Sequence, residues 1–417
     1  MTFITNCPAE GHTQILHDNS KLVASCPKSN SDCLRTVGVV TGSRSDYGLL
    51  VPLLRAIDAD PALKLQLWAT GAHFARQFGS TIDEILNDGF QIAEKIDMLL
   101  ASDTPEGVSK SIGLGLCGFA QAYARNRPDI LVGLGDRFEL FAAVQAALPF
   151  NIPVAHISGG EVTEGAIDES IRHAITKLSH LHFVAAELYA RRVIQMGEEP
   201  WRVHVSGEPG LDNIATMDFL TKDEVENRIG ILLSPKPLLV TFHPVTLESG
   251  ETSRYINELL EALNESSQPT VFTYPNADPG GTLIIDAIER YVASKSNARV
   301  VRNLGRRAYC SLMKYAAAMV GNSSSGIAEA ASFELPAVNI GHRQQGRLVG
   351  RNVINCDSER MAINKAIQEA TAPEFRASIR GMQNLYGDGH ASERIVKVIR
   401  DTPLDRKLIV KRFHDID

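Results

Sequence analysis

Residues 130–157 of the chain read ILVGLGDRFELFAAVQAALPFNIPVAHI. Two short apolar runs, Ile130–Gly133 and Val154–Ile157, flank a helical period over residues 138–148. Strand-length apolar runs separated by one helix are typical of a β–α–β unit, whose two strands lie parallel in one sheet. The stretch therefore predicts an α/β fold with helices packed on the faces of a parallel sheet.

The same alternation extends in both directions from this unit. In the first half we expect further strands at Thr36–Thr41, Leu63–Ala69, His182–Val184 and Val203–Val205, and helices near 46–58, 80–88, 106–126, 166–179 and 186–196. The alternation is broken by Gly207, Pro209 and Gly210 and then restarts. In the second half we expect strands at Leu238–Phe242, Thr270–Thr273, Arg299–Val301, Met319–Val320 and Ala337–Asn339, and helices near 252–265, 282–293, 307–316, 326–333, 358–370 and 391–401.

This pattern predicts two successive doubly wound, Rossmann-type domains with a cleft between them. We place the first at residues 35–208 and the second at 209–390. A C-terminal helix and tail at 391–417 is expected to pack back on the first domain. Residues 1–34 are polar and aperiodic, and are interpreted as an extension outside both domains.

The composition restricts the classes of protein. Of 417 residues, 44% are hydrophobic and 22% charged, which is typical of a globular chain, and the net charge of −7 disfavours nucleic acid or an anionic membrane as the main partner. The six cysteines include no C-x-x-C pair, so no zinc or redox site is indicated. No apolar run approaches the roughly 20 residues of a membrane span, and Met1–Asn19 lacks a signal-peptide pattern. We therefore expect a cytoplasmic protein.

Ligands of doubly wound sheets bind beyond the carboxyl ends of the strands, so the residues that follow each strand are the first candidates. After the first strand, Arg44 is a candidate for binding phosphate, and Asp46 is a candidate helix N-cap and ligand contact. The segment is not G-x-G-x-x-G, and no acidic residue ends the second strand. A dinucleotide site is therefore disfavoured.

Three acidic residues follow later strands of the first half. Asp136 and Arg137 come after Ile130–Gly133, and Glu161 follows a Gly-Gly turn after the next strand. Asp168 and Arg172 begin the following helix at an i, i+4 spacing. Each residue alone is equally consistent with a cap or a solvated ion pair, but their convergence on one cleft favours an acid–base site.

Polar residues also follow the strands of the second half. His243 comes after Leu238–Phe242, and Asn276 occupies the corresponding place after the next strand. His243 is a candidate phosphate ligand or acid, with a buried structural histidine as the alternative. Asn276 is a candidate ligand contact or simply a turn residue.

The sharpest local signal is Gly321–Glu329, which reads GNSSSGIAE. A strand, a loop of small residues and a helix start form a cradle for a diphosphate, because backbone N–H groups, hydroxyls and the helix dipole all favour an anion. The candidate phosphate contacts are Ser323, Ser324, Ser325 and Gly326. Glu329 is a candidate for accepting hydrogen bonds from ribose, and Arg343 and Arg347 downstream are candidate nucleotide contacts. The loop matches neither a Walker motif nor G-x-S-x-G.

Together these segments resemble the hydrolysing UDP-N-acetylglucosamine 2-epimerase family. The resemblance runs in order over residues 35–414 and rests on Thr41–Gly48, Gly135–Glu139, Gly159–Lys177, Phe242–Thr246, Pro275–Asp278, Gly321–Glu329 and Gly341–Arg347. It implies a GT-B-like fold, UDP held mainly by the second domain, a homodimer or homotetramer, and no cofactor or metal.

The resemblance also implies roles for single residues. Asp136, Glu161 and Asp168 match the family's acidic catalytic positions, and His243 matches a histidine near the phosphates. The remaining matches are to ligand-binding positions: Ser323 and Ser324 to phosphate-binding hydroxyls, Glu329 to the ribose-binding Glu, and Arg44 and Arg343 to nucleotide-binding arginines.

The expected reaction converts UDP-N-acetylglucosamine and water to free N-acetylmannosamine and UDP. Loss of UDP and of the C2 hydrogen in an anti elimination gives a glycal. Water then adds at C1, and C2 gains a proton on the opposite face. An alternative is the same chemistry on UDP-2,4-diacetamido-2,4,6-trideoxyglucose (UDP-N,N'-diacetylbacillosamine), on the legionaminic acid route, or on a GDP-linked donor. The motifs are also compatible with a GT-B glycosyltransferase, a non-hydrolysing epimerase or a UDP-sugar-binding protein without activity.

Overall fold

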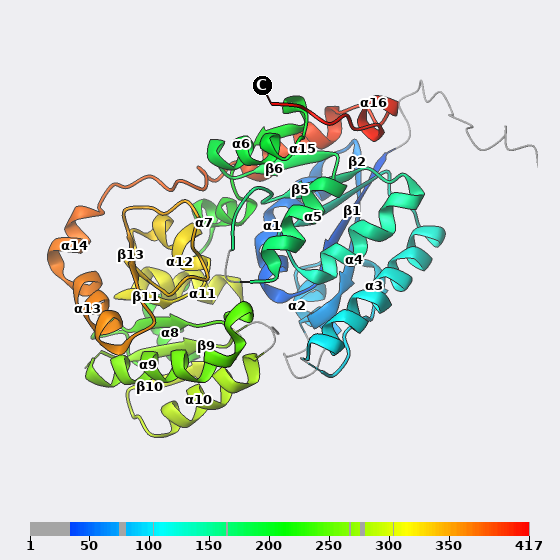
Figure 1. Ribbon diagram of the computed structural model, residues 1–417. Helices are drawn as coiled ribbons and strands as arrows, with labels where there is room; N and C mark the ends of the chain where they lie inside the picture. Colours follow the sequence, from blue (N-terminus) through cyan, green and yellow to red (C-terminus); the bar gives the residue numbers. More distant parts are fainter. Residues whose placement is uncertain are drawn as a thin grey trace, which may run out of the picture. The chain divides into compact units, whose positions relative to one another are not determined.

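The computed structural model describes residues 34–416, apart from residues 75–80, 103, 164–165, 267, 276–279 and 303. Leu34–Asp417 form one compact unit with two separate sheets, each built only of parallel strands (Figure 1). This confirms the predicted α/β fold with two Rossmann-type sheets. No helix in the described part of the chain is long and apolar enough to cross a bilayer. The predicted extension at residues 1–34 lies outside the described residues, except for Leu34.

The first sheet has seven strands in the order β3-β2-β1-β4-β5-β6-β7. Its strands are β1 (Arg35–Thr41), β2 (Leu63–Thr70), β3 (Ile92–Ile96), β4 (Ile130–Leu134), β5 (Val154–Ile157), β6 (Leu181–Val184) and β7 (Val203–Val205). Its helices are α1 (Arg44–Ala59), α2 (Ile82–Asn87), α3 (Pro105–Arg125), α4 (Phe138–Ala147), α5 (Asp168–Leu178) and α6 (Glu187–Gln195). The strand order reverses between β1 and β4, which is the point at which such sheets bind ligands.

The second sheet repeats this plan with six strands in the order β10-β9-β8-β11-β12-β13. Its strands are β8 (Leu238–Thr241), β9 (Thr270–Thr273), β10 (Ala298–Val301), β11 (Ala318–Gly321), β12 (Ala337–Ile340) and β13 (Val353–Cys356). The associated helices are α7 (Asp212–Thr216), α8 (Lys222–Ile229), α9 (Thr252–Glu265), α10 (Gly281–Ala293), α11 (Gly305–Tyr315), α12 (Ser325–Ala328), α13 (Arg360–Thr371) and α14 (Pro373–Ser378).

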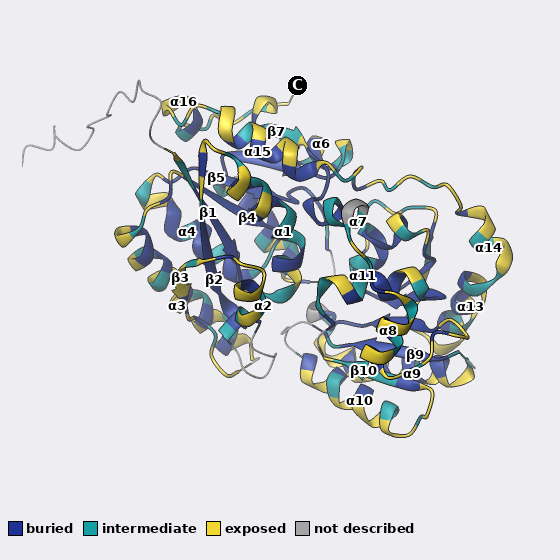
Figure 2. Cartoon of the chain, turned by 180° about the vertical axis from the view of Figure 1, so that it is seen from behind, coloured by how far each residue is buried: buried dark blue, intermediate teal, exposed yellow. Residues whose placement is uncertain are grey.

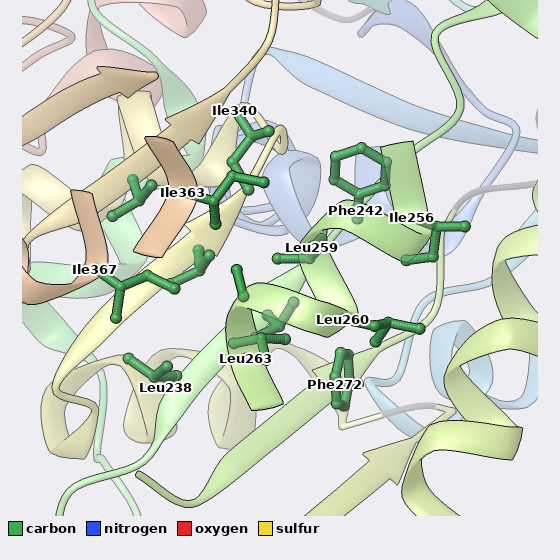
Figure 3. Packing of buried hydrophobic residues seen from close by; sticks show 14 of the residues in the cluster. Leu238, Phe242, Ile256, Leu259, Leu260, Leu263, Phe272, Ile340, Ile363 and Ile367 are labelled. Atoms are coloured by element: carbon green, nitrogen blue, oxygen red, sulfur yellow. The ribbon is translucent and has the colours of Figure 1, made fainter. Parts of the chain in front are cut away.

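Both sheets are covered by helices on both faces, because successive side chains of a strand point to opposite sides. In β8, Leu238 and Val240 pack with α9, α10 and α13, whereas Leu239 packs on the other face with α8 and α11. Figure 3 shows the first of these clusters, in which Leu259 and Ile363 are fully buried. Each fully buried side chain of this kind stabilises the fold by about 1.5–3 kcal/mol.

The chain's last helices pack on the first sheet's layer of helices. α15 (Ala391–Asp401) and α16 (Arg406–Ile409) place Ile395, Ile399 and Leu408 in the core that lies between α1 and the first sheet. The buried guanidinium of Arg202 donates hydrogen bonds to the backbone carbonyls of three tail residues, Lys407, Leu408 and Val410, at 2.9, 2.8 and 3.2 Å. The C-terminal segment is thus tied to the residues just before β7.

Several elements differ from the sequence-based prediction, and among them the helices α7, α8, α14 and α16 were not predicted. The strands β3 and β13 were not predicted either, and both are edge strands with partly exposed side chains, so they lack a continuous apolar run. Figure 2 shows β3 at the edge of the first sheet. The single helix predicted at 326–333 is instead the four-residue α12 followed by a 3₁₀ turn at Ala330–Phe333.

Candidate active site

A cavity of about 270 Å³ lies at the carboxyl ends of strands from both sheets. Its walls come from the segments after β1, β4, β5, β7, β8, β10, β11 and β12. The sequence-predicted residues that line it are Arg44, Asp46, Asp136, Arg137, Glu161, Asp168, Arg172, His243, Ser323, Ser324, Ser325, Glu329 and Arg343. Residues from both halves of the chain therefore meet at one place. Asn276 lies outside the described residues.

The buried guanidinium of Arg172 joins two of the predicted acids. Arg172 Nη2 forms an ion pair with Asp136, and Arg172 Nη1 lies 3.7 Å from Glu161 Oε2. Arg172 also donates to the carbonyl of Ser158 at 2.8 Å and to the hydroxyl of Thr163 at 3.1 Å. Its donors are thus directed at the acid-bearing loops, which fits a role in positioning the carboxylates, while Arg172 also lines the cavity.

A second arginine reaches the same acids from the other sheet. Arg347, in the loop after β12, has Nη1 2.9 Å from Glu161 Oε2 and donates from Nε to the Val162 carbonyl at 2.9 Å. Burial disfavours the charged guanidinium, but the combined effect of Glu161, Tyr386, Asp136 and Tyr189, led by Glu161, outweighs this and raises the pKa of Arg347. The sequence suggested a nucleotide contact for Arg347. In the structure its contacts hold Glu161, because the β12 loop lies over the loop after β5.

The cavity also contains a carboxyl group that the sequence analysis missed. Glu208 follows β7, is buried, and accepts a hydrogen bond from the Ser158 hydroxyl at 2.7 Å to Oε1 and 2.9 Å to Oε2. It is also hydrogen-bonded to Glu161. Burial, together with the negative charge of Glu161, raises the pKa of Glu208 to about 8. Its position after a strand was the available signal, but the segment was interpreted only as a domain boundary.

The predicted phosphate cradle forms at the end of β11. Gly321 has φ +139°, and a Cβ there would lie 1.9 Å from the carbonyl oxygen of Thr241, so only glycine allows β11 and β8 to approach here. The Asn322 side chain accepts from His243 N at 2.7 Å and donates to the His243 carbonyl at 2.9 Å. Asn322, which the sequence analysis did not single out, thereby fixes the histidine beside the serine loop.

The serines and Arg343 surround the same end of the cavity. Ser323, Ser324 and Ser325 line it, and Arg343 donates to the Asn322 carbonyl at 3.1 Å. Gly326 is different: its N–H donates to the Ser323 carbonyl at 3.1 Å, and an added Cβ would lie 3.5 Å from that of Ala337. Its position suits close packing of α12 on the sheet, and its contact with phosphate stays a prediction.

Glu329 lies at the end of α12 and carries an ion pair with Arg306. Arg306, at the start of α11, also donates to the carbonyl of Gly210 at 2.6 Å, so it ties α11 to the segment between β7 and β8. Its position after β10 was the signal that could have identified it.

Two predicted residues stand at the start of α1. Asp46 accepts from the backbone N–H groups of Gly42 and Ser43 at 2.8 and 2.7 Å and completes a capping box with Ser43. This carboxylate is thus engaged in capping, which accounts for Asp46 without a ligand. Arg44 donates to the Arg302 carbonyl at 3.2 Å, and burial lowers its pKa.

Arg137 lies beside the acids, at the start of α4. Its Nε is 3.5 Å from Glu139 Oε2, and its guanidinium carbon lies 5.4 Å from the centroid of the Phe138 ring.

Two parallel doubly wound sheets that share one cavity, lined by acids from the first half of the chain and by a loop of small residues from the second, define a GT-B-like enzyme of nucleotide-sugar chemistry. Comparison with known proteins agrees. The UDP-N-acetylglucosamine 2-epimerase family model matches residues 55–400, and the chain belongs to this family of hydrolysing epimerases.

The matches to individual relatives and to a solved structure extend over nearly the whole length of those proteins. A protein of Campylobacter jejuni named GDP/UDP-N,N'-diacetylbacillosamine 2-epimerase (hydrolyzing) is 40% identical, over 92% of this chain and 99% of its own. A UDP-N,N'-diacetylbacillosamine 2-epimerase (hydrolyzing) of Legionella pneumophila is 37% identical, over 91% and 99%. The crystal structure of the UDP-GlcNAc 2-epimerase of Neisseria meningitidis bound to UDP-GlcNAc matches in fold, with TM-score 0.76 and 19% identity over 88% of this chain and 100% of that one.

Proposed function

We propose that the chain is a hydrolysing 2-epimerase of UDP-2,4-diacetamido-2,4,6-trideoxyglucose, releasing UDP and the free, C2-inverted sugar. The observation that carries the choice of sugar is the likeness to two proteins named as diacetylbacillosamine 2-epimerases, at 40% and 37% identity over nearly their full lengths. This revises the substrate expected from the motifs, UDP-N-acetylglucosamine. Those motifs are the proposed contacts of the nucleotide and of the reacting carbons, which the two donors share.

The arrangement of the cavity supports the reaction type. In an anti elimination, one carboxylate removes the C2 hydrogen while the C1–O bond breaks and UDP leaves with its electron pair. Water then bonds to C1, and C2 takes a proton on the other face. Such a sequence needs acids and bases on two sides of the sugar, and Asp136, Glu161 and Asp168 from two successive loops supply candidates.

Departure of UDP requires stabilisation of the negative charge that develops on its phosphate. The Ser323–Ser325 loop, His243 and Arg343 line the cavity together and are the proposed contacts for the diphosphate. Glu329 is the proposed ribose contact. Accepting ribose hydrogen bonds would require the Arg306 pair to rearrange or to share the carboxylate.

Proton NMR in deuterated water tests the proposal directly. The purified full chain is incubated separately with UDP-2,4-diacetamido-2,4,6-trideoxyglucose, its GDP-linked counterpart and UDP-N-acetylglucosamine. We expect the first donor to give UDP and a free sugar with deuterium at C2, at the highest kcat/KM of the three. Faster turnover of UDP-N-acetylglucosamine would refute the choice of sugar. A UDP-linked epimer as product would refute hydrolysis, and no turnover of any donor would refute the proposed function.

A further inference from the structure

The Glu208 carboxyl lies directly against Glu161 in the buried wall of the cavity. The Ser158 hydroxyl donates to Glu208, and the Glu208 backbone N–H donates to the Tyr386 carbonyl at 2.8 Å. These contacts leave Glu208 facing another carboxyl, with which it shares a hydrogen bond. Two carboxyl groups can be hydrogen-bonded to each other only if one of them holds a proton.

The charges around the pair indicate which carboxyl is protonated. The Glu161 carboxylate is paired with Arg347 at 2.9 Å and lies 3.7 Å from Arg172, which also pairs with Asp136. This connected set contains the two guanidinium groups of Arg172 and Arg347 and three carboxyl groups, those of Asp136, Glu161 and Glu208. Two of the carboxyls can be balanced as carboxylates, and the third, Glu208, is the one whose side chain is hydrogen-bonded to a hydroxyl and to the other glutamate.

We propose that Glu208 is the proton reservoir of the site: a carboxylic acid that supplies, through Glu161, the proton that C2 gains in the hydration step. The proposal rests on the proposed function and adds a residue to its mechanism. Glu208 acts through Glu161, so it is a positioning and proton-sharing residue rather than one that contacts the reacting atoms.

The protons balance over the two steps. In the elimination, H2 is taken by a base and finally reaches solvent, and UDP leaves with the C1–O electron pair. In the hydration, Glu161 takes the proton of Glu208 and passes it to C2, where the electrons of the glycal double bond form the new C2–H bond. The water that bonds to C1 as hydroxyl gives up a proton, and that proton restores the Glu161–Glu208 pair.

The electrostatic surroundings of Glu208 agree with this role. Burial and the Glu161 charge favour its neutral form, whereas the Ser158 hydrogen bond and Arg347 act in the opposite direction, and the net effect leaves its pKa at about 8. A carboxylic acid with a pKa near the working pH holds a proton and can still release it.

Glu208→Gln tests the inference, because glutamine has the size of the neutral acid but cannot release a proton. The full chain is given the UDP-linked donor and, separately, the 1,2-glycal of its sugar. The rates of UDP release, glycal accumulation and glycal hydration are followed by NMR, with UDP affinity and Tm as checks on folding. The matched control is Glu106→Gln, on an exposed side chain of α3.

We expect Glu208→Gln to hydrate the glycal about 100- to 10,000-fold more slowly than the wild type and to accumulate glycal after releasing UDP. Glu106→Gln should behave as the wild type. In the wild type, glycal hydration should fall about tenfold per pH unit above pH 8, and this measurement decides the matter if the variant does not fold. Two results would overturn the inference. One is a glycal hydration rate in Glu208→Gln within threefold of the wild type, and the other is a wild-type hydration rate that does not change up to pH 9.5. A wild type that is inactive on every donor would instead overturn the proposed function.

Discussion

Arg347 offers a sharp test of how the two sheets are joined at the acids. The change Arg347→Met removes the guanidinium but keeps most of the aliphatic stem. It leaves Glu161 without its 2.9 Å ion-pair partner and removes the donors to the Val162 carbonyl and the Thr163 hydroxyl. The side chain of Arg347 is 8% exposed and that of Glu161 is 4% exposed, so solvent cannot replace the lost partner.

Removing one member of a buried ion pair costs about 3–5 kcal/mol, and Glu161 then keeps only its more distant cationic neighbour, Arg172 at 3.7 Å. The Leu34–Asp417 unit should lose roughly 0.8 kcal/mol of unfolding free energy per degree near its Tm. The expected drop in Tm is therefore about 4–6 °C. The matched control is Arg254→Met, whose pair with Glu251 is about half exposed on both sides. The control should lower Tm much less, because an exposed ion pair contributes little to stability.

The assay combines calorimetric unfolding with titration of UDP and steady-state kinetics. Arg347→Met should reduce kcat at least tenfold through misplacement of Glu161 and leave UDP affinity within about threefold of the wild type. A Tm drop no larger than that of Arg254→Met would refute the energetic reasoning. A large loss of UDP affinity with unchanged kcat would show that Arg347 contacts the nucleotide instead.

Three other parts of the site can be tested in the same way. Because the pKa of Glu208 is raised to about 8, the folded state keeps a proton that the unfolded state releases above about pH 4.5. The contribution of Glu208 to wild-type stability should therefore fall by about 1.4 kcal/mol per pH unit as pH rises toward 8. The Tm of Glu208→Gln relative to the wild type should accordingly rise between pH 5 and pH 8, and an equal difference at both would contradict the assignment. Gly321→Ala places its Cβ 1.9 Å from a strand carbonyl oxygen and should lower UDP affinity at least tenfold, while Gly113→Ala, with open space on α3, should stabilise by up to about 1 kcal/mol. A UDP affinity of Gly321→Ala within twofold of the wild type would contradict the expected effect of the close approach between β11 and β8. Asp136→Asn and Glu161→Gln should each lower turnover at least 100-fold with UDP affinity nearly unchanged, and near-normal turnover in both would remove them from the mechanism.

Much of the fold was predictable from the sequence because it depends on local periodicity. Runs such as Ile130–Gly133 and Val154–Ile157 are buried on both faces of a parallel sheet, so they are continuously apolar and easy to recognise. The edge strands β3 and β13 were missed for the converse reason, since one side of each lacks a neighbouring strand and their side chains are partly exposed.

The sequence by itself also determined where to look for the site, since residues after parallel strands must meet at one edge of a sheet. It predicted Asp136, Glu161 and the Ser323–Ser325 loop on that basis. Only the tertiary structure decided which side chains are partners. Arg347 lies 186 positions from Glu161 along the chain, and Glu208 lies 47 positions from it, yet Glu161 contacts both. Such pairings depend on how loops from two sheets fold over one another, and the protonation of Glu208 depends on the burial and charge that this packing creates.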